Sequence, residues 1–211
     1  GAAVLACLGA GISGAGMIHA LVPEEARTPL LTAMPEIIFE RGLPDLAPFR
    51  AVVLGPGWVP ADTALFEKIV QEAQRRPELG LVLDAGAFAP LAQLFSQGRT
   101  LCENIVITPH TGEFARLFPE ISARLKSPAA ETRIQRLEAA AWAAHACSAV
   151  VVLKGARTHI AAPDKSVDSI LRSSELLAHA GQGDVLAGLI GGLMATGHES
   201  KKAATRAALS R

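Results

Sequence analysis

The sequence lacks an excess of charge of either sign, because 20 Lys and Arg residues balance 20 Asp and Glu residues in a chain of 211. A balanced composition offers no polybasic surface for nucleic acid or for a membrane, so any anion-binding site must be local. Cysteine is also scarce. The three cysteines, Cys7, Cys102 and Cys147, are an odd number without the spacing of a metal site. They favour a reduced, cytoplasmic protein over a disulfide-bonded one, and we interpret them as small buried hydrophobic residues.

Residues 1–22 contain no Asp, Glu, Lys or Arg, and an apolar stretch of this kind can resemble a membrane span or a signal peptide. Four glycines between residues 9 and 16 interrupt it and no basic residue precedes it, so we reject both interpretations. We expect a short buried helix, a glycine turn and a strand near Met17 to Val22. Because the sequence begins with Gly rather than Met, we expect it to be a fragment that begins inside an element whose earlier part is absent.

Half of the residues are hydrophobic and no long polar linker divides the chain, so we expect a single domain. From residue 51 onward, short and continuous apolar segments alternate with helical patterns. This alternation is typical of an α/β fold, with a mostly parallel central sheet covered by helices on both faces. The predicted strands are Ala51–Leu54, Gly80–Leu83, Asn104–Ile107 and Ala149–Leu153, and a β-hairpin in the C-terminal half pairs Thr158–Ala161 with Val167–Ile170. Three helices are predicted: one from Pro23 toward Leu31, one over about residues 61–75, and one that begins at Ser127 and Pro128. Residues 35–50 contain three prolines and are predicted to be irregular.

Each predicted parallel strand ends in polar or glycine-rich residues. Gly55-Pro56-Gly57, Asp84, Thr108-Pro109-His110 and Lys154-Gly155 follow the four strands in turn. In open α/β sheets the ligand lies beyond the carboxyl ends of the strands. We therefore expect these four strand ends to face one crevice.

The stretch Gly181-Gln182-Gly183-Asp184 should face the same crevice. Its glycines let the backbone approach a ligand, and the apolar run that follows, to Met194, predicts a buried helix. The first amides of such a helix can receive phosphate oxygens, which makes this stretch a candidate anion site. Asp184 would then accept a proton from a substrate hydroxyl or hold a metal ion. Alternatively, Asp184 caps the amino end of the helix, and the residues alone leave both interpretations open.

Together, these segments resemble the ADP-dependent NAD(P)H-hydrate dehydratases, a family of the ribokinase-like superfamily. The resemblance covers nearly the whole chain, and the Thr-Pro-His-x-Gly-Glu-Phe segment is its most specific part. It implies that residues 1–211 form one ribokinase-like domain that is truncated at the amino end and slightly at the carboxyl end. The matching segments are Gly55-Pro56-Gly57, Val82-Leu83-Asp84-Ala85, Ile107–Phe114, Val152–Thr158 and Gly181–Gly188.

The resemblance implies a repair lyase that acts on hydrated NADH or NADPH. In this family ADP donates a phosphoryl group to the ring hydroxyl, and elimination of phosphate then restores NAD(P)H, with AMP as the other product. Mg²⁺ and ADP are the implied cofactors. The implied partners are these small molecules and further copies of the chain in a homo-oligomer, with neither nucleic acid nor a membrane.

The resemblance also assigns roles to individual residues. Asp184 would be the base, and it would also contact the hydrated dinucleotide. Glu113 would bond backbone amides at a helix start or help to place Mg²⁺, and Asp84 is a further candidate. Lys154 could alternatively be a solvated lysine at a strand end, and His110 could be a packing residue. The implied phosphate site is Gly181, Gln182 and Gly183; the nucleotide site is Lys154, Gly155, Ala156, Arg157, Thr158 and Gly183; and the other dinucleotide contacts are Ala2, Gly57 and His110.

Several positions depart from the family pattern. The chain has Gln182 where Thr or Ser is common, and Thr111 where Pro is usual. It also lacks the second acid, the leucine and the Asn that usually follow Asp84, and the Asn-x-Gly segment that is expected earlier than Gly181. Two rival functions follow: a small-molecule kinase of the same superfamily, such as a vitamin-precursor kinase, or a nucleotide-binding relative with impaired catalysis. The residues at the departing positions are Gly86, Phe88, Ala89, Thr111, Ser173-Ser174-Glu175 and Gln182.

Overall fold

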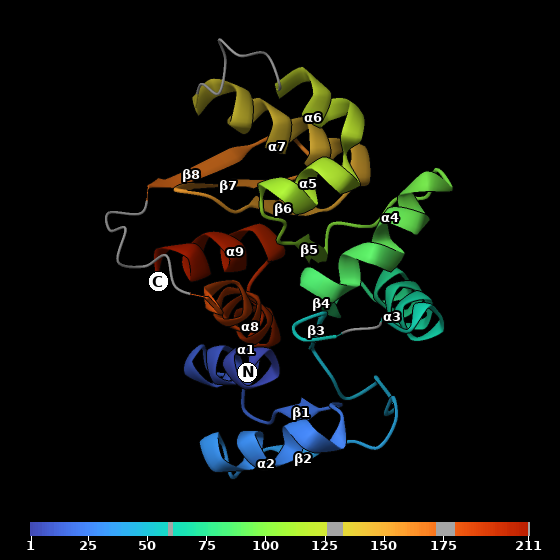
Figure 1. The fold of residues 1–211 in the computed structure, drawn as a ribbon, viewed down its shortest axis with the longest axis vertical. Helices are drawn as coiled ribbons and strands as arrows, with labels where there is room; N and C mark the ends of the chain where they lie inside the picture. The colour runs from blue at the N-terminus through green and yellow to red at the C-terminus, as the bar shows by residue number, and fades with distance from the viewer. Residues whose placement is uncertain (59–60, 126–132, 172–179, 211) are drawn as a thin grey trace.

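A six-stranded sheet, with strand order β3-β4-β5-β6-β7-β8, forms the centre of the computed structural model, which describes residues 1–58, 61–125, 133–171 and 180–210 (Figure 1). Strands β3 to β6 are parallel, whereas β7 runs antiparallel to both β6 and β8. The strands are β3 (Ala51–Leu54), β4 (Gly80–Leu83), β5 (Ile105–Ile107), β6 (Val150–Leu153), β7 (Arg157–Ala161) and β8 (Val167–Leu171). The mostly parallel sheet and the predicted hairpin are therefore confirmed.

Helices cover both faces of this sheet, and a short 3₁₀ helix, η1, follows β4. A separate pair of two-residue parallel strands, β1 (His19–Ala20) and β2 (Ile38–Phe39), lies near the amino end of the chain. The helices are α1 (Ala2–Ile12), α2 (Glu24–Ala33), α3 (Thr63–Arg75), η1 (Ala85–Ala87), α4 (Phe88–Ser96), α5 (Thr111–Leu117), α6 (Pro119–Leu125), α7 (Arg133–Cys147), α8 (Gln182–Ala195) and α9 (Ser200–Leu209).

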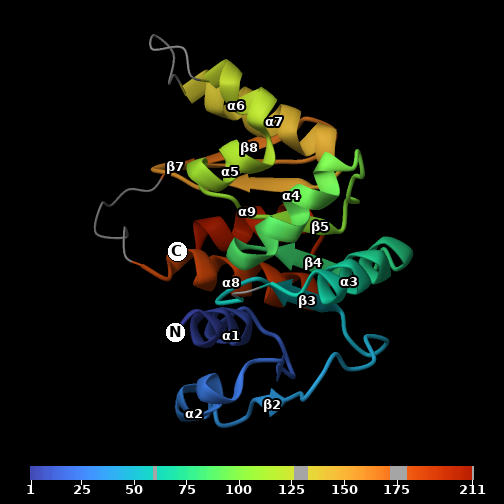
Figure 2. The same cartoon turned by 45° about the vertical axis from the view of Figure 1, so that its right-hand side comes forward.

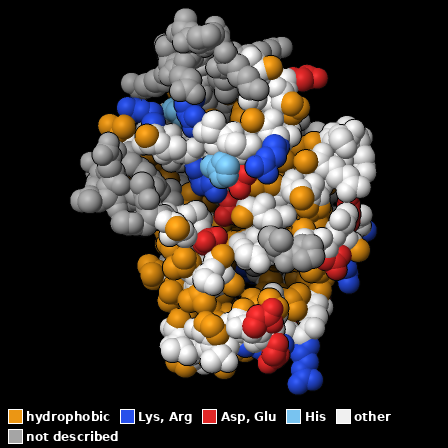
Figure 3. Space-filling view, viewed as in Figure 1, with side chains coloured by type: hydrophobic (Ala, Val, Ile, Leu, Met, Phe, Trp, Pro, Cys, Tyr) orange, Lys and Arg blue, Asp and Glu red, His pale blue; other side chains and the backbone are white. Residues whose placement is uncertain are grey.

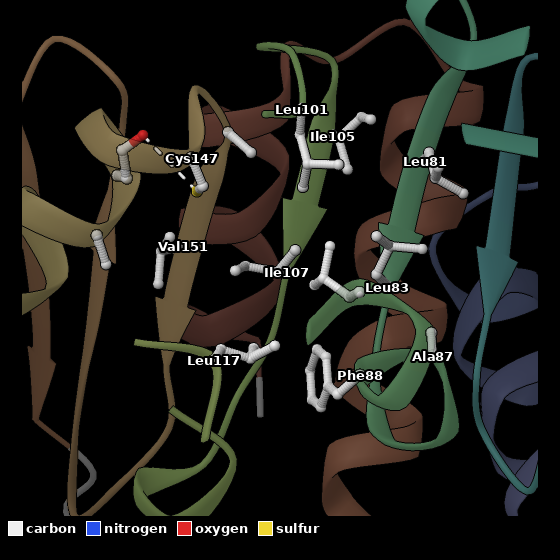
Figure 4. Packing of buried hydrophobic residues seen from close by; sticks show 14 of the residues in the cluster. Leu81, Leu83, Ala87, Phe88, Leu101, Ile105, Ile107, Leu117, Cys147 and Val151 are labelled. Atoms are coloured by element: carbon white, nitrogen blue, oxygen red, sulfur yellow. Dashed lines mark hydrogen bonds between the residues drawn. The ribbon is translucent and has the colours of Figure 1, made fainter. Parts of the chain in front are cut away.

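Successive residues of the central strands point to opposite faces of the sheet and fill two different cores. Leu81 and Leu83 of β4 pack with α3, α4, α5 and α7, and Figure 4 shows Leu83 beside Ile107 of β5. Val82, between them, packs on the other face with α8 and α9. Because both faces are apolar, the strands appear in the sequence as continuous hydrophobic runs rather than as alternating patterns.

Helix α1 lies between α8 and α2 in both ribbon views (Figures 1 and 2). Its contact with α8 is close, because a Cβ added to Gly188 would lie 1.9 Å from the carbonyl oxygen of Ala6. On the other side of α1, a third apolar cluster joins Leu30 of α2 and Met34, which follows that helix, to the small sheet. The amino-terminal segment is therefore part of the packed structure, and within the described ranges no helix has the length and apolar character that would span a bilayer.

Most of the predicted elements are present, with shifted ends. The strand predicted at residues 17–22 is only two residues long, and the stretch 35–50 contains β2, so that stretch is not irregular throughout. Residues 127–128, the predicted start of the long helix, and 173–175 lie outside the described residues, but α7 confirms the later part of that helix. Helices α4, α6 and α9 were not predicted, because polar, proline-containing or alanine-rich segments gave no clear apolar period, and α5 was expected only as a helix start near Glu113.

Candidate active site at the carboxyl edge of the sheet

Three neighbouring strands deliver a buried carboxylate, a hydroxyl and a lysine to one point. Asp84 follows β4, Thr108 follows β5, and Lys154 follows β6. The Asp84 Oδ1 atom accepts hydrogen bonds from Thr108 Oγ1 at 2.7 Å and from Lys154 Nζ at 2.8 Å. The side chain of Asp84 is 2% exposed and that of Lys154 is 18% exposed. Lys154 is therefore not a solvated lysine at a strand end, and the alternative proposed from the sequence is wrong.

His110 and Glu113 cap helix α5 reciprocally. The His110 Nδ1 atom accepts hydrogen bonds from the backbone amides of Gly112 at 3.0 Å and Glu113 at 3.4 Å, and Glu113 Oε2 accepts one from the His110 amide at 2.8 Å. This geometry confirms that Glu113 binds a backbone amide at a helix start. The same Glu113 oxygen lies 3.9 Å from Lys154 Nζ, so the cap also faces the lysine. The His110 ring is 56% exposed, so it is not a buried packing residue.

Helix α8 begins beside the same lysine. Gly181 is its N-cap, with the left-handed φ of 88° that glycine adopts without strain, and Asp184 lies within the first turn. The alternative in which Asp184 caps the helix is therefore wrong. A Cβ added to Gly183 would lie 3.3 Å from Lys154 Nζ and 3.8 Å from Asp84 Oδ2. The first turn of α8 thus approaches the Asp84–Lys154 pair closely, as the predicted crevice requires.

The Asp184 carboxyl differs from an ordinary surface carboxyl. Partial burial and the charge of Asp84 raise its pKa above the usual value, and the charge of Lys154 opposes this rise. A carboxylate with a raised pKa holds a proton more strongly than an ordinary Asp does. Asp184 is therefore suited to accept a proton from a hydroxyl.

The amino end of α1 completes this edge of the site. The Cβ of Ala2 would lie 3.3 Å from a Cβ added to Gly57, and the side chain of Leu5 lies against Gly181. The structure therefore brings Ala2 and Gly57 together and places α1 beside the start of α8. A shared binding role for Ala2, Gly57 and Asp184 stays a prediction.

The other predicted nucleotide residues lie in the turn between β6 and β7 and at the start of β7. Gly155 and Ala156 are exposed, Arg157 is partly exposed, and Thr158 is 1% exposed on β7. The Oγ1 atom of Thr158 has no hydrogen-bond partner among the described residues, which is uncommon for a buried hydroxyl.

On the face drawn in Figure 3, histidine, basic and acidic side chains gather near the centre. Hydrophobic and uncharged groups cover most of the surface over α1 and α2.

The described residues do not form a complete metal site by themselves, because no group of three His, Cys, Asp or Glu side chains has suitable geometry. Mg²⁺ at phosphoryl-transfer sites usually takes one or two carboxylates and completes its coordination with phosphate oxygens and water. Asp84, Glu113 and Asp184 are carboxylates that could act in this way beside a bound nucleotide. The donor set therefore fits Mg²⁺ only together with phosphate.

Two residues of the site were missed or undervalued from the sequence. Thr108 lay inside the predicted motif but was given no role, although it binds Asp84. Arg136 lies on α7 and reaches the backbone of Lys154 and the hydroxyl of Thr111. No sequence signal marks it, because arginine at a helical position usually lies on a solvated face.

The strand order and the glycine-rich start of α8 at the carboxyl edge define the chain as an α/β protein with a ribokinase-like fold. The family model described as NAD(P)H-hydrate dehydratase matches residues 1–211, and the chain belongs to this family.

Relatives of known name show the same similarity. The chain is 40% identical over 207 residues to the bifunctional NAD(P)H-hydrate repair enzyme of Gloeobacter violaceus, a match that covers 92% of this chain and 38% of that protein. It is 32% identical over 218 residues to the ADP-dependent (S)-NAD(P)H-hydrate dehydratase of Bacillus subtilis, covering 98% of this chain and 72% of that protein. The chain thus spans less than two fifths of the length of the bifunctional enzyme.

A solved structure agrees with these relatives. It is the ADP/ATP-dependent NAD(P)H-hydrate dehydratase of Bacillus subtilis, co-crystallised with ATP and Mg²⁺. This structure is similar to the chain with a TM-score of 0.76 and 30% identity, over 99% of this chain and 72% of that one.

Proposed function

We propose that the protein dehydrates hydrated NADH or NADPH with ADP as the phosphoryl donor. Family membership supports the reaction class, and the approach of the first turn of α8 to Lys154 and Asp84 is the observation that carries it. This turn contributes backbone amides and the carboxyl of Asp184, whose pKa is raised, and the Lys154 ammonium lies beside it. Phosphoryl transfer to a hydroxyl requires these three groups: donors for the phosphoryl oxygens, a cation and a proton acceptor.

In the first step, Asp184 takes the proton of the ring hydroxyl while the hydroxyl oxygen attacks the β-phosphorus of ADP. The bond from that phosphorus to the bridging oxygen breaks, and AMP leaves with the bond electrons. The amides of residues 181–183 and the Lys154 ammonium stabilise the negative charge on the transferring oxygens. The product of this step is a phosphate ester of the hydrated ring.

In the second step, the carbon–oxygen bond of this ester breaks and inorganic phosphate leaves. A proton leaves the neighbouring ring carbon, and its bond electrons form the double bond of the reduced nicotinamide. Phosphorylation makes this possible because phosphate is a far better leaving group than hydroxide. The enzyme therefore uses kinase chemistry to achieve a dehydration.

The turn of residues 154–158 is proposed to bind the adenine nucleotide, with Thr158 offering its unpartnered hydroxyl. The loop around His110, together with Ala2 and Gly57, is proposed to bind the hydrated dinucleotide. Mg²⁺ would be held by the nucleotide phosphates with Asp84, Glu113 or Asp184, and it would neutralise phosphate charge. The solved Bacillus structure with ATP and Mg²⁺ supports the use of a nucleotide and this ion.

Residues 1–211 are proposed to act as one dehydratase domain in a homo-oligomer in the cytoplasm. The three free cysteines are consistent with a reducing compartment. Oligomer formation would cover exposed large hydrophobic side chains, of which several lie in the amino-terminal part. They are Ile12, Met17, Leu21, Leu31 and Ile38.

The test is recovery of the reduced-nicotinamide absorbance band when the purified protein is given hydrated NADH or hydrated NADPH with ADP and Mg²⁺. We expect recovery that requires ADP, with stoichiometric release of AMP and phosphate. Asp184→Asn should lower the rate by at least about 10³-fold, because it removes the proton acceptor while keeping the size of the side chain. ADP binding without any recovery by the wild-type protein would refute the dehydratase and favour the impaired relative. ADP or ATP consumption with a small alcohol alone would instead favour the kinase.

A further inference from the structure

The guanidinium of Arg136 joins the two loops to which the proposed function assigns the two substrates. Its Nη2 atom donates a hydrogen bond to the backbone carbonyl of Lys154 at 3.2 Å, and its Nη1 atom donates one to Thr111 Oγ1 at 3.1 Å. Lys154 opens the turn proposed for the nucleotide. Thr111 follows His110 directly and opens α5, at the end of the loop proposed for the dinucleotide. The planar guanidinium of one side chain on α7 therefore holds both loops at once.

Gly155 makes room for this guanidinium. A Cβ added at Gly155 would lie 2.8 Å from Arg136 Nη2, a distance that real Cβ atoms do not show, and 3.3 Å from the carbonyl oxygen of Arg157. The resemblance places this glycine in the nucleotide site, where a residue without a side chain leaves its amide accessible to a ligand. The structure gives it a second purpose, because any side chain there would displace the guanidinium from the Lys154 carbonyl.

Other contacts also join these two loops among the described residues. The amide of Lys154 donates to the carbonyl of Pro109 at 2.9 Å in a backbone bridge, and Lys154 Nζ lies 3.9 Å from Glu113 Oε2. No carboxylate of the described residues lies within 4.0 Å of a nitrogen of Arg136, so both of its hydrogen bonds go to neutral acceptors. Because Arg136 donates its hydrogen bonds to neutral groups of the two loops, it orders the loops and no carboxylate neutralises its positive charge there.

We propose that Arg136 is a positioning residue that sets the distance between the nucleotide turn and the dinucleotide loop, with Gly155 as the position that accommodates it. This inference rests on the proposed function for the identity of the two ligands. The hydrogen bond to the Lys154 carbonyl, one arm of the guanidinium, orders the nucleotide turn. The hydrogen bond to Thr111, the other arm, orders the loop of His110. Loss of the first should therefore raise the Kd for ADP, and loss of the second should raise the KM for the hydrated dinucleotide.

The first experiment measures the Kd for ADP by calorimetry, without the hydrated dinucleotide. Arg136→Met should raise this Kd about tenfold, the loss expected for one charge-assisted hydrogen bond. Arg136→Lys keeps the charge but cannot bond both loops, so its Kd should rise about threefold. Arg75→Met is the matched control: it removes the same charge from a 73% exposed arginine at the end of α3, before β4 begins, and should leave the Kd unchanged.

The second experiment separates the two arms by steady-state kinetics. Thr111→Val keeps the shape of the side chain and removes the acceptor, so it should raise the KM for the hydrated dinucleotide about threefold and leave the Kd for ADP within about twofold of wild type. In all these variants the Tm is measured as well. A change in Kd or KM that the Tm does not follow indicates positioning, because a purely structural role would lower the Tm and leave the affinity of the folded protein intact.

The third experiment tests the role of Gly155 with a double-mutant cycle. Gly155→Ala should raise the Kd for ADP in the wild-type background and have no further effect in the Arg136→Met background. The proposal is overturned if Arg136→Met leaves the Kd within about twofold of wild type, if Arg136→Lys binds ADP as well as wild type does, or if the two substitutions are additive. ADP binding by a wild type that shows no dehydration would refute the proposed function alone, whereas absence of ADP binding would overturn both.

Discussion

Replacing Lys154 with methionine tests whether the Asp84–Lys154 pair is a buried ion pair. The substitution keeps the length of the side chain and removes the only cation within 4.0 Å of the Asp84 carboxylate among the described residues. Removing one partner of a fully buried pair costs about 3–5 kcal/mol, whereas an exposed pair contributes about 0–1 kcal/mol. Here Asp84 is nearly inaccessible and Lys154 is 18% exposed, while the Thr108 hydroxyl remains to bond the carboxylate.

We therefore expect Lys154→Met to lower the free energy of unfolding by about 2–3 kcal/mol. For a chain of this size that loss corresponds to a decrease in Tm of about 4–12 °C. Urea unfolding followed by circular dichroism would measure the free energy, and a thermal scan would measure the Tm. Lys68→Met, at an exposed position on α3, is the control and should change the free energy by less than about 0.5 kcal/mol.

The double variant Asp84→Asn with Lys154→Met removes both charges. If the cost of the single substitution comes from an unpaired buried carboxylate, the double variant should recover at least about 1 kcal/mol of it. A loss below about 0.5 kcal/mol in Lys154→Met would show that the pair behaves like a solvated surface pair. No recovery in the double variant would show that the lysine acts through packing instead. Either result would refute the reasoning.

Three further predictions concern the site and its supports. Burial and a neighbouring carboxylate raise the pKa of Asp184. Protonation of this base on acidification should therefore lower turnover, and the decrease should begin at a higher pH than for a base with the pKa of an ordinary Asp. A pH–rate profile would measure this. Because the ionised form is the one that folding disfavours, Asp184→Asn should not lower the Tm. Gly188→Ala should lower the free energy of unfolding by about 3 kcal/mol, because the added Cβ would overlap the backbone of α1. Gly16→Ala is the control, because a Cβ there meets open space and should have little effect. Chemical denaturation would measure the free energy of unfolding of both variants. Burial raises the pKa of Cys7 to about 11 and of Cys147 to about 12. At pH 8 both thiols should react with a disulfide reagent more than about tenfold slower than a free thiol, until the protein is unfolded.

The departures from the family pattern have partly local explanations. A Cβ added to Gly86 would lie 2.0 Å from the carbonyl oxygen of Trp58, so the loop after β3 packs where the family usually has an acidic side chain. Thr111, in place of the usual proline, provides the hydroxyl that Arg136 binds. The structure gives no account of Gln182 beyond its place in the first turn of α8.

The sequence by itself determined the sheet and the edge where the site lies. Continuous apolar runs such as Gly80–Leu83 can be buried only between two helical layers, and parallel strands bring their carboxyl ends to one edge. The left-handed turn at Gly181 and the apolar helix behind it are local features as well. Local residue preferences and strand periodicity are sufficient for all of these features, so a single chain reveals them.

Only the tertiary structure decided how the residues at that edge pair with one another. Lys154 and Asp84 are 70 positions apart, and the sequence could equally place the lysine in solvent. The role of Arg136 likewise depends on where α7 crosses the end of β6, and the capping role of His110 depends on the conformation of one loop. The physical reason is that these contacts join segments whose distance is set by helix packing on the sheet, and no local pattern in the chain records that distance.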